Sequence, residues 1–250
     1  MTSLRLLHVD DEPDIREIVA FSLGLDVAIS VCSCASGAEA LSMAADWSPD
    51  MILCDVMMPS MDGPATLARL RECPQTAHMP VVFMTARAQA SEIQCFKSLG
   101  AAGVIAKPFD PLALGALIRS HISLPRSAPS HSYVLPPADT FDSIRAGFLK
   151  RLSQDADELF QFQSVLAKEP GMPSGLNRIR AIAHGLAGAG GIFGFPQISG
   201  AAADLEQAII VEFENNNSPR SVYQALDRLL ASIAAYLPKQ IDEARYRTVL

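Results

Sequence analysis

Acidic residues follow short apolar segments in the first half of the chain. Asp10 and Asp11 come after Leu4–Val9, and Asp55 comes after Met51–Cys54. If these segments are parallel strands, their carboxyl ends meet at one edge of a sheet and bring the carboxylates together. Clustered carboxylates repel one another and call for a cation. A ligand set of oxygens, with no histidine or cysteine offered, favours Mg²⁺ over zinc.

Two further polar residues are expected at the same edge. Thr85 ends the segment that starts at Val81, and Lys107 follows Val104–Ala106. Asp55 lies on the central strand, where a carboxylate is suited to attack phosphorus as a nucleophile. Lys107 supplies a positive charge and Thr85 a hydroxyl donor, and phosphoryl transfer needs mainly such positioning and neutralisation. Each residue alone is more often a turn former, helix cap or solvated loop residue, so the specificity lies in the combination.

Alternating strands and helices must position these residues. Short apolar segments alternate with helical patterns, which predicts a parallel sheet covered by helices on both faces. Ser36 and Glu39 have the spacing of a capping box at one helix start. The expected strands are Leu4–Val9, Val27–Cys34, Met51–Cys54, Val81–Met84 and Val104–Ala106, and the expected helices are Pro13–Leu25, Gly37–Asp46, Pro64–Glu72, Gln89–Leu99 and Pro111–Ile122.

Four motifs in this half match a known family in order, spacing and strand position. They are HVDDEP (8–13), CDVMMPSMDG (54–63), VVFMTA (81–86) and AKPF (106–109). Residues 4–122 resemble the receiver domain of two-component response regulators. The resemblance implies a flavodoxin-like, five-stranded parallel α/β fold, with Asp55 as the residue that is phosphorylated.

The resemblance also implies the metal ligands. Asp11, Asp55 and the Met57 carbonyl would bind Mg²⁺, for which Mn²⁺ can substitute, and Asp10 would act largely through metal-bound water. A haloacid-dehalogenase-type phosphatase, which also forms an aspartyl phosphate, is a rival class. Those enzymes usually carry an Asp two residues after the nucleophile, and Met57 at that position argues against them.

The phosphoryl group has its own expected ligands. The resemblance implies that Thr85 and Lys107 bind it and that the Lys107–Pro108 peptide is cis. One residue departs from the family pattern. Many receivers carry Tyr or Phe in the fifth strand as a switch, and this chain has Val104 there, so the usual aromatic readout is in question.

The second half has a different organisation. Residues 124–140 contain four prolines and three serines without apolar periodicity, which predicts a linker. We therefore expect a receiver domain at 1–124, a linker at 125–140 and a second domain at 141–250. No strand pattern follows, and helices joined by short connections predict an all-α, antiparallel four-helix bundle. The expected helices are Phe141–Lys168, Leu176–Phe193, Pro196–Phe213 and Ser221–Leu237.

A histidine lies in the glycine-rich segment 178–195 of this half. Each glycine inside a helix costs about 1 kcal/mol relative to alanine, so a helix that keeps several must need a bare surface. Gly188 lies one turn after His184 on the same face, where a partner's active site could reach the imidazole. His184 could then accept and release a phosphoryl group. The alternative is that His184 is a packed residue in a bundle that only docks partners.

The pattern around this histidine resembles a second family. His184, Leu186, Gly188 and Gly194 are similar to the histidine-phosphotransfer (HPt) domain over residues 141–237. The resemblance implies that His184 carries the phosphoryl group. The family commonly has Lys three residues after the histidine, where this chain has Ala187. Arg180, one turn before His184, could supply that charge instead.

Composition excludes several classes of partner. The 250 residues carry a net charge of −7, and no stretch concentrates Lys and Arg, so we expect no nucleic-acid binding. No apolar run approaches the roughly 20 residues that cross a bilayer, and no signal-peptide pattern begins the chain, so we expect no membrane and a cytoplasmic location. The five cysteines, an odd number, are expected to be small buried residues in a reducing compartment.

Together these observations predict a two-domain phosphorelay protein. Its partners would be a sensor histidine kinase and other receiver or phosphotransfer domains. Nothing in the chain resembles the ATP-binding part of a histidine kinase or a DNA-binding module, so it would be no autonomous kinase. The rival prediction is a response regulator whose helical bundle docks partners without phosphotransfer.

Overall fold

A computed structural model describes residues 3–86, 89–122, 138–166, 175–215 and 220–237. The chain forms two compact units that divide between Ile144 and Arg145. Most of the expected linker lies outside the described residues.

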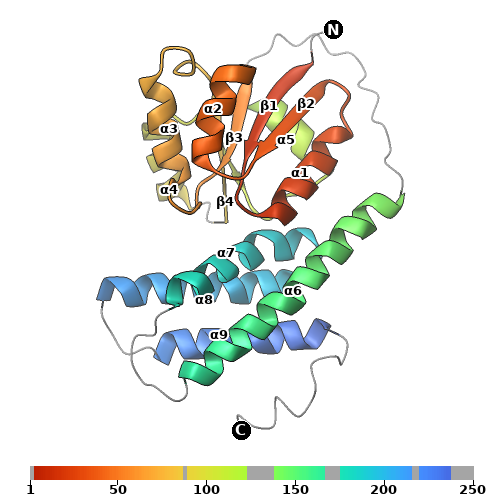
Figure 1. The fold of residues 1–250 in the computed structure, drawn as a ribbon, viewed down its shortest axis with the longest axis vertical. Helices are drawn as coiled ribbons and strands as arrows, with labels where there is room; N and C mark the ends of the chain where they lie inside the picture. The colour runs from red at the N-terminus through yellow and green to blue at the C-terminus, as the bar shows by residue number, and fades with distance from the viewer. Residues whose placement is uncertain (1–2, 87–88, 123–137, 167–174, 216–219, 238–250) are drawn as a thin grey trace. The chain divides into compact units, whose positions relative to one another are not determined.

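The first unit is built on one parallel sheet (Figure 1). The strand order is β2-β1-β3-β4-β5, and every neighbouring pair is parallel. This order is that of the flavodoxin-like open sheet, which confirms the expected fold. The strands are β1 (Leu4–Val9), β2 (Ile29–Cys34), β3 (Met51–Asp55), β4 (Val81–Thr85) and β5 (Gly103–Ala106).

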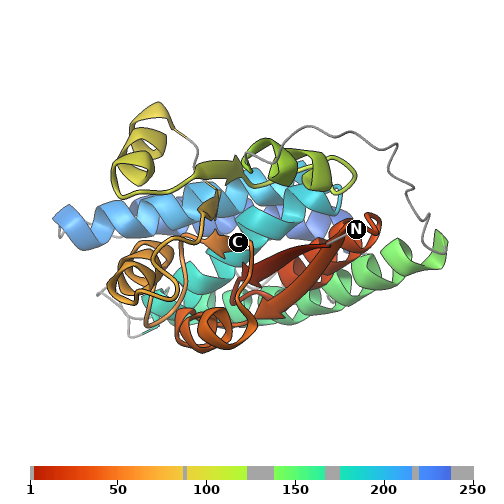
Figure 2. The same ribbon diagram turned by 90° about the horizontal axis from the view of Figure 1, so that it is seen from above.

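Helices cover both faces of this sheet. As Figures 1 and 2 show, α1 and α5 lie on one face, and α2, α3 and α4 lie on the other. The central strands are buried on both faces for that reason, and every residue of β3 and β4 is buried. The helices are α1 (Pro13–Gly24), α2 (Gly37–Trp47), α3 (Gly63–Glu72), α4 (Ala90–Ser98) and α5 (Leu114–Ser120).

Local hydrogen bonds explain where some element boundaries differ from expectation. β2 begins at Ile29 instead of Val27, because Asp26 closes a turn by accepting from the backbone N–H groups of Ala28 and Ile29. Val27 is consequently 62% exposed.

The start of α2 follows the capping-box prediction with one difference. The Ser36 hydroxyl accepts from the Glu39 backbone N–H, as expected of an N-cap. The Glu39 carboxylate accepts from Ala35 instead of from Ser36 itself. α5 begins at Leu114 instead of Pro111, because the preceding turn is closed by the Asp110 carboxylate.

The cysteines were only partly predicted. All five are free, and Cys34 and Cys54 are buried as expected. Cys95 is exposed on α4, so the prediction that all five are buried is wrong. α4 buries none of its residues, which is why a cysteine there lies in solvent.

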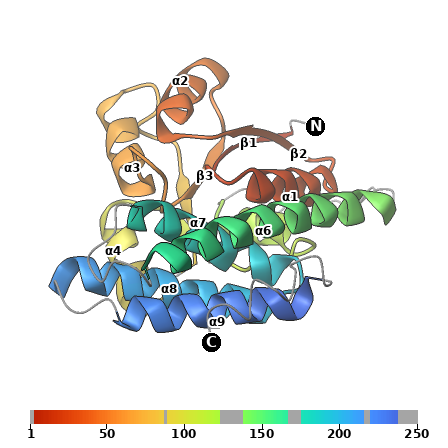
Figure 3. The same ribbon diagram turned by 60° about the horizontal axis from the view of Figure 1, so that its bottom comes forward.

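The second unit is all-helical in its described residues (Figure 3). Its α7 and α8 pack against each other as an antiparallel pair joined by three residues, and α8 also packs along α9. In the connecting turn, Gly194 has a φ of +89°, a conformation that favours glycine. The predicted four helices are confirmed as α6 (Ala138–Leu166), α7 (Leu176–Ile192), α8 (Pro196–Asn215) and α9 (Arg220–Tyr236).

An aromatic cluster joins three of these helices. Phe148 of α6 stacks on Phe193 and Phe195 in the α7–α8 turn, with ring centroids 4.7 and 5.8 Å apart. Phe195 also meets Tyr236 of α9 edge-on at 5.3 Å. α7 and α8 approach closely at Gly190, where a Cβ atom would lie 3.1 Å from the Ser199 backbone nitrogen. Glycine thus serves close helix packing in this part of α7.

Candidate functional site

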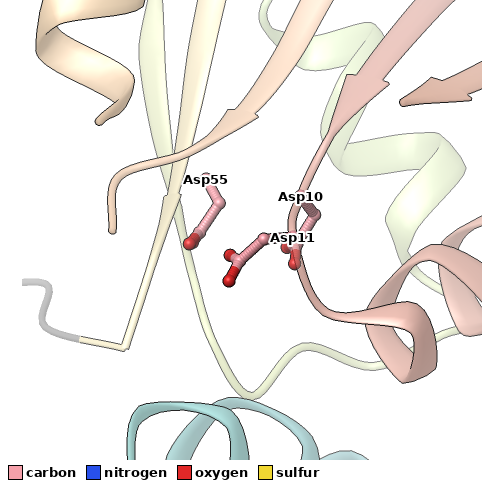
Figure 4. A group of neighbouring side chains, drawn as sticks. All are labelled: Asp10, Asp11 and Asp55. Carbon is pink, nitrogen blue, oxygen red and sulfur yellow. The ribbon is translucent and has the colours of Figure 1, made fainter. Parts of the chain in front are cut away.

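Asp10, Asp11 and Asp55 lie together at the carboxyl edge of the sheet (Figure 4). Asp10 and Asp11 directly follow β1, and Asp55 is the last residue of β3. Each residue offers a carboxylate oxygen within 4.8 Å of the others. Asp10 and Asp55 are fully buried, and Asp11 is half-buried. The juxtaposition expected from parallel strands is therefore present.

Lys107 joins two of these carboxylates. Its Nζ lies 2.8 Å from Asp10 Oδ2 and 2.9 Å from Asp55 Oδ1, with all three side chains buried. Lys107 follows β5 directly, and the Lys107–Pro108 peptide is cis, as expected. Thr85 is buried at the end of β4, and its carbonyl accepts a 2.7 Å hydrogen bond from the Lys107 backbone N–H. The sequence-predicted polar residues thus gather at one edge.

Hydrogen bonds from two backbone N–H groups and from one side chain hold Asp10 and Asp55 in place. The Glu12 backbone N–H donates to Asp10 Oδ1 at 2.9 Å, and the Met57 backbone N–H donates to Asp55 Oδ2 at 3.2 Å. The Arg16 guanidinium donates to the Asp10 carbonyl at 2.7 Å. Both carboxylates therefore have a fixed orientation before any ligand arrives.

Burial and the neighbouring charges shift the pKa values of Asp10 and Lys107. Burial raises the pKa of Asp10 to about 6, although Lys107 acts in the opposite direction. Burial lowers the pKa of Lys107, but the charges of Asp10 and Asp55 outweigh it, so the net shift is upward and the ammonium stays protonated. A buried cluster with more negative than positive charge favours the binding of a further cation.

The donor set fits a hard divalent cation. Three carboxylates converge here with no cysteine or histidine among them, which is the chemistry of an Mg²⁺ site rather than a zinc site. Receiver domains typically use Mg²⁺, and this acidic cluster fits that use.

His8 is a neighbour of this site that the sequence reasoning missed. It lies on β1, fully buried, with Nε2 4.0 Å from Asp10 Oδ2 and Nδ1 3.4 Å from the Ser33 hydroxyl. Burial, assisted by the charge of Lys107, lowers the pKa of His8 to about 3, so the ring is neutral. The available signal was a second polar residue, besides the half-buried Arg5, in a mostly apolar strand.

His184 lies on α7 and pairs with a residue that the sequence reasoning also missed. Its Nδ1 is 3.1 Å from Glu206 Oε1 on α8. The two residues are 9% and 3% exposed. The signal for Glu206 was a carboxylate about one helical turn from the buried apolar residues Ala202 and Ile209.

Other predicted features of this segment lie on the same helix. Ala187 and Gly188 are buried in α7, and the Ala187 carbonyl accepts a 2.6 Å hydrogen bond from the Ser199 hydroxyl. Arg180 is half-buried one turn before His184. The lysine that the HPt family usually carries at position 187 is replaced here by a small buried residue whose carbonyl accepts a hydrogen bond from α8.

Comparison with protein families agrees with both units. The response regulator receiver domain matches residues 6–119, and the Hpt domain matches residues 146–244. Together with the sheet order and the acidic edge, these matches define a receiver followed by a phosphotransfer module. The chain belongs to the response regulator family and is a two-component phosphorelay protein. These domains imply phosphotransfer partners, such as histidine kinases and other phosphorelay domains.

Individual relatives match parts of the chain. Response regulator Rre1 of Synechocystis is 31% identical over 175 residues, covering 70% of this chain and 68% of Rre1. Response regulator PleD of Caulobacter vibrioides is 41% identical over 120 residues, covering 47% of this chain but 26% of PleD. The chemotaxis response regulator CheY4 of Vibrio cholerae has 32% identity and a TM-score of 0.46, covering 48% of this chain and 100% of CheY4.

Within the described helices, none combines the length and apolar character needed to cross a membrane.

Proposed function

We propose that Asp55 is the phosphoacceptor of the receiver unit. The observation that carries this proposal is the position of its carboxylate at the end of β3, 2.9 Å from Lys107 Nζ and beside Asp10 and Asp11. A sensor histidine kinase would supply the phosphoryl group. We place the protein in the cytoplasm, where such kinases present their phosphohistidine.

The chemistry uses groups that the fold already holds. An Asp55 oxygen forms a bond to phosphorus as the P–N bond of the donor phosphohistidine breaks, and the leaving imidazole takes up a proton. Lys107 neutralises charge on the phosphoryl oxygens, and the Thr85 hydroxyl donates a hydrogen bond to them. Asp11, Asp55 and the Met57 carbonyl would hold Mg²⁺, or Mn²⁺ in its place, with Asp10 acting largely through metal-bound water, and the ion would supply further charge neutralisation.

We propose that His184 carries the phosphoryl group in the second unit. The pairing of Nδ1 with Glu206 supports a proton at Nδ1 and a lone pair at Nε2. Nε2 then attacks the phosphorus of an aspartyl phosphate, the bond from phosphorus to the aspartyl oxygen breaks, and a carboxylate leaves. The negative charge of Glu206 stabilises the positive charge that develops on the ring.

The receiver proposal is tested with Asp55→Asn. We expect the full chain to be phosphorylated by acetyl phosphate only in the presence of Mg²⁺ or Mn²⁺, and Asp55→Asn to take up no phosphate, because an amide is a poor nucleophile. Asp62→Asn is the matched control, because Asp62 is an exposed N-cap of α3 and Asn caps equally well. Full incorporation of phosphate into Asp55→Asn would overturn the assignment.

A further inference from the structure

His8 is a buried polar side chain that the proposed chemistry does not use. It lies two residues before Asp10 on β1, and none of its surface is exposed. Among the described residues, its Nε2 has no hydrogen-bond partner. A buried donor without a partner destabilises the fold, so a chain that keeps one is expected to use it in another state.

The ring is oriented toward the acidic site. Nε2 lies 4.0 Å from Asp10 Oδ2, which is too long for a hydrogen bond, and Nδ1 lies 3.4 Å from the Ser33 hydroxyl on β2. The Asp10 carboxylate attracts the ring proton to Nε2. The Ser33 hydroxyl then donates to Nδ1, and the neutral ring presents an N–H group to Asp10.

Lys107 pairs with Asp10 Oδ2, the same oxygen that His8 Nε2 faces. Its ammonium is 2.8 Å from Asp10 Oδ2 and 2.9 Å from Asp55 Oδ1. A phosphoryl group on Asp55 would bring additional anionic oxygens to this ammonium. As Lys107 turns toward them, Asp10 Oδ2 loses a donor. A closure of about 1 Å would bring His8 Nε2 within hydrogen-bond distance.

We propose that His8 is a positioning residue, which donates its Nε2–H to Asp10 Oδ2 when Asp55 is phosphorylated. The inference rests on the proposed phosphorylation of Asp55. The new bond replaces the one from Lys107 and keeps the Asp10 carboxylate directed at the cation site. The His8 Nε2–H group, which lies on β1 inside the sheet, thereby stabilises the phosphorylated state.

The test compares three full-length chains: wild type, His8→Leu and His8→Gln. The probe is beryllofluoride with Mg²⁺, a tetrahedral anion that mimics a phosphoryl group on a carboxylate, and its affinity is measured by calorimetry. We expect His8→Leu to bind about tenfold more weakly, because a hydrogen bond to a charged group is lost. His8→Gln should stay within about threefold of wild type, because its amide N–H takes the place of Nε2–H.

A second measurement separates this role from a folding defect. Trp47 is the only tryptophan in the chain and lies in the receiver unit, so its fluorescence reports unfolding of that unit. Without ligand, His8→Leu should be at least as resistant to urea as wild type, because an unpartnered buried donor has been replaced by an apolar group. If His8 served only in packing, His8→Leu would not combine unchanged or higher stability with weaker binding of beryllofluoride.

Nitrogen NMR of the His8 ring gives a third reading. We expect the Nε2–H tautomer with and without beryllofluoride, and a shift of the Nε2 resonance when the probe binds. Equal affinity of wild type and His8→Leu, or binding by His8→Gln as weak as that of His8→Leu, would overturn the inference. Failure of the wild-type chain to bind beryllofluoride would instead overturn the proposed function of Asp55.

Discussion

Lys107 is a buried cation that balances part of the negative charge of the acidic site. It pairs with Asp10 and Asp55, and all three side chains are buried. Removing one partner from a buried ion pair costs about 3–5 kcal/mol, because the charge left behind is not compensated. Stability of the receiver and the proposed binding of a phosphoryl group therefore depend on the same ammonium.

We predict that Lys107→Met lowers the free energy of unfolding of the receiver by about 3–5 kcal/mol at pH 7.5 in the presence of a chelator. The pKa of Asp10 is already raised to about 6 and should rise further without Lys107. When the pKa of a carboxyl is higher in the folded state, the protein loses stability as pH rises through that pKa. The difference in free energy of unfolding between Lys107→Met and wild type should therefore be smaller at about pH 5 than at pH 7.5. Added Mg²⁺ should also restore part of the stability.

Urea unfolding followed by Trp47 fluorescence measures this deficit. Lys97→Met is the matched control, because Lys97 is exposed on α4. An unfolding midpoint for Lys107→Met equal to that of the control at both pH values would contradict the prediction.

Glu206 provides a residue-scale test in the helical unit. Its carboxylate pairs with His184 Nδ1 at 3.1 Å. We predict that Glu206→Ala slows transfer to His184 by about 10- to 100-fold, the effect of losing one hydrogen bond to a charged group. Glu206→Gln keeps an oxygen that accepts from Nδ1–H and should fall between Glu206→Ala and wild type.

The measurement is the rate of transfer from a phosphorylated receiver, together with the nitrogen NMR shifts of the His184 ring. Loss of the Nδ1–H tautomer in Glu206→Ala should accompany the slower rate. A rate equal to wild type in Glu206→Ala would show that His184 does not depend on this contact.

Sequence reasoning succeeded for residues at strand ends and failed for partners across elements. Asp10, Asp55 and Lys107 could be placed together because parallel strands share one carboxyl edge. His8 faces Ser33, and Glu206 faces His184, through contacts that depend on strand register and on how α7 packs against α8. One sequence without that packing gives no reason to pair them.

At the scale of elements, α3 begins directly against the end of β3, which carries Asp55, the proposed phosphoacceptor. A Cβ atom on Gly63, the first residue of α3, would lie 2.4 Å from the Asp55 carbonyl oxygen and 3.0 Å from Val56 Cα. Both contacts are to backbone, so they cannot be relieved by turning a side chain. The Gly63 N–H also donates to the Val56 carbonyl at 2.9 Å.

We predict that Gly63→Ala destabilises the receiver by about 1–3 kcal/mol, the usual range for overpacking, and slows phosphorylation of Asp55. Trp47 fluorescence in urea and incorporation of phosphate from acetyl phosphate measure the two effects. Gly24→Ala is the matched control, because nothing lies within 4 Å of a Cβ atom at the end of α1. Gly63→Ala behaving like Gly24→Ala would contradict the close approach of α3.

Elements were predicted well where their own sequence determines them. The apolar strands and the Ser36 N-cap follow from local pattern, and their positions are confirmed. Boundaries moved where a side chain closes a turn, as Asp26 does before β2. α6 begins at Ala138, ahead of the expected Phe141, because neither the prolines nor the serines that precede it mark a helix start unambiguously.

At the scale of the whole molecule, each unit carries its own proposed phosphoryl site, Asp55 in one and His184 in the other. A pair of full-length variants separates them: Asp55→Asn keeps the histidine, and His184→Gln keeps the aspartate. We predict that His184→Gln, loaded with radiolabelled phosphate on Asp55, passes label to Asp55→Asn after the small donor is removed. The acceptor chain is distinguished from the donor chain by a tag.

The chemical lability of the label identifies the atom that carries it. Phosphate on the Asp55→Asn chain should be acid-labile and base-stable, as expected of phosphohistidine, whereas phosphate on the His184→Gln chain should be base-labile. The doubly substituted chain is the control and should take up none. If the Asp55→Asn chain takes no label from this or any other phosphorylated receiver, His184 is structural and the helical unit acts only in docking.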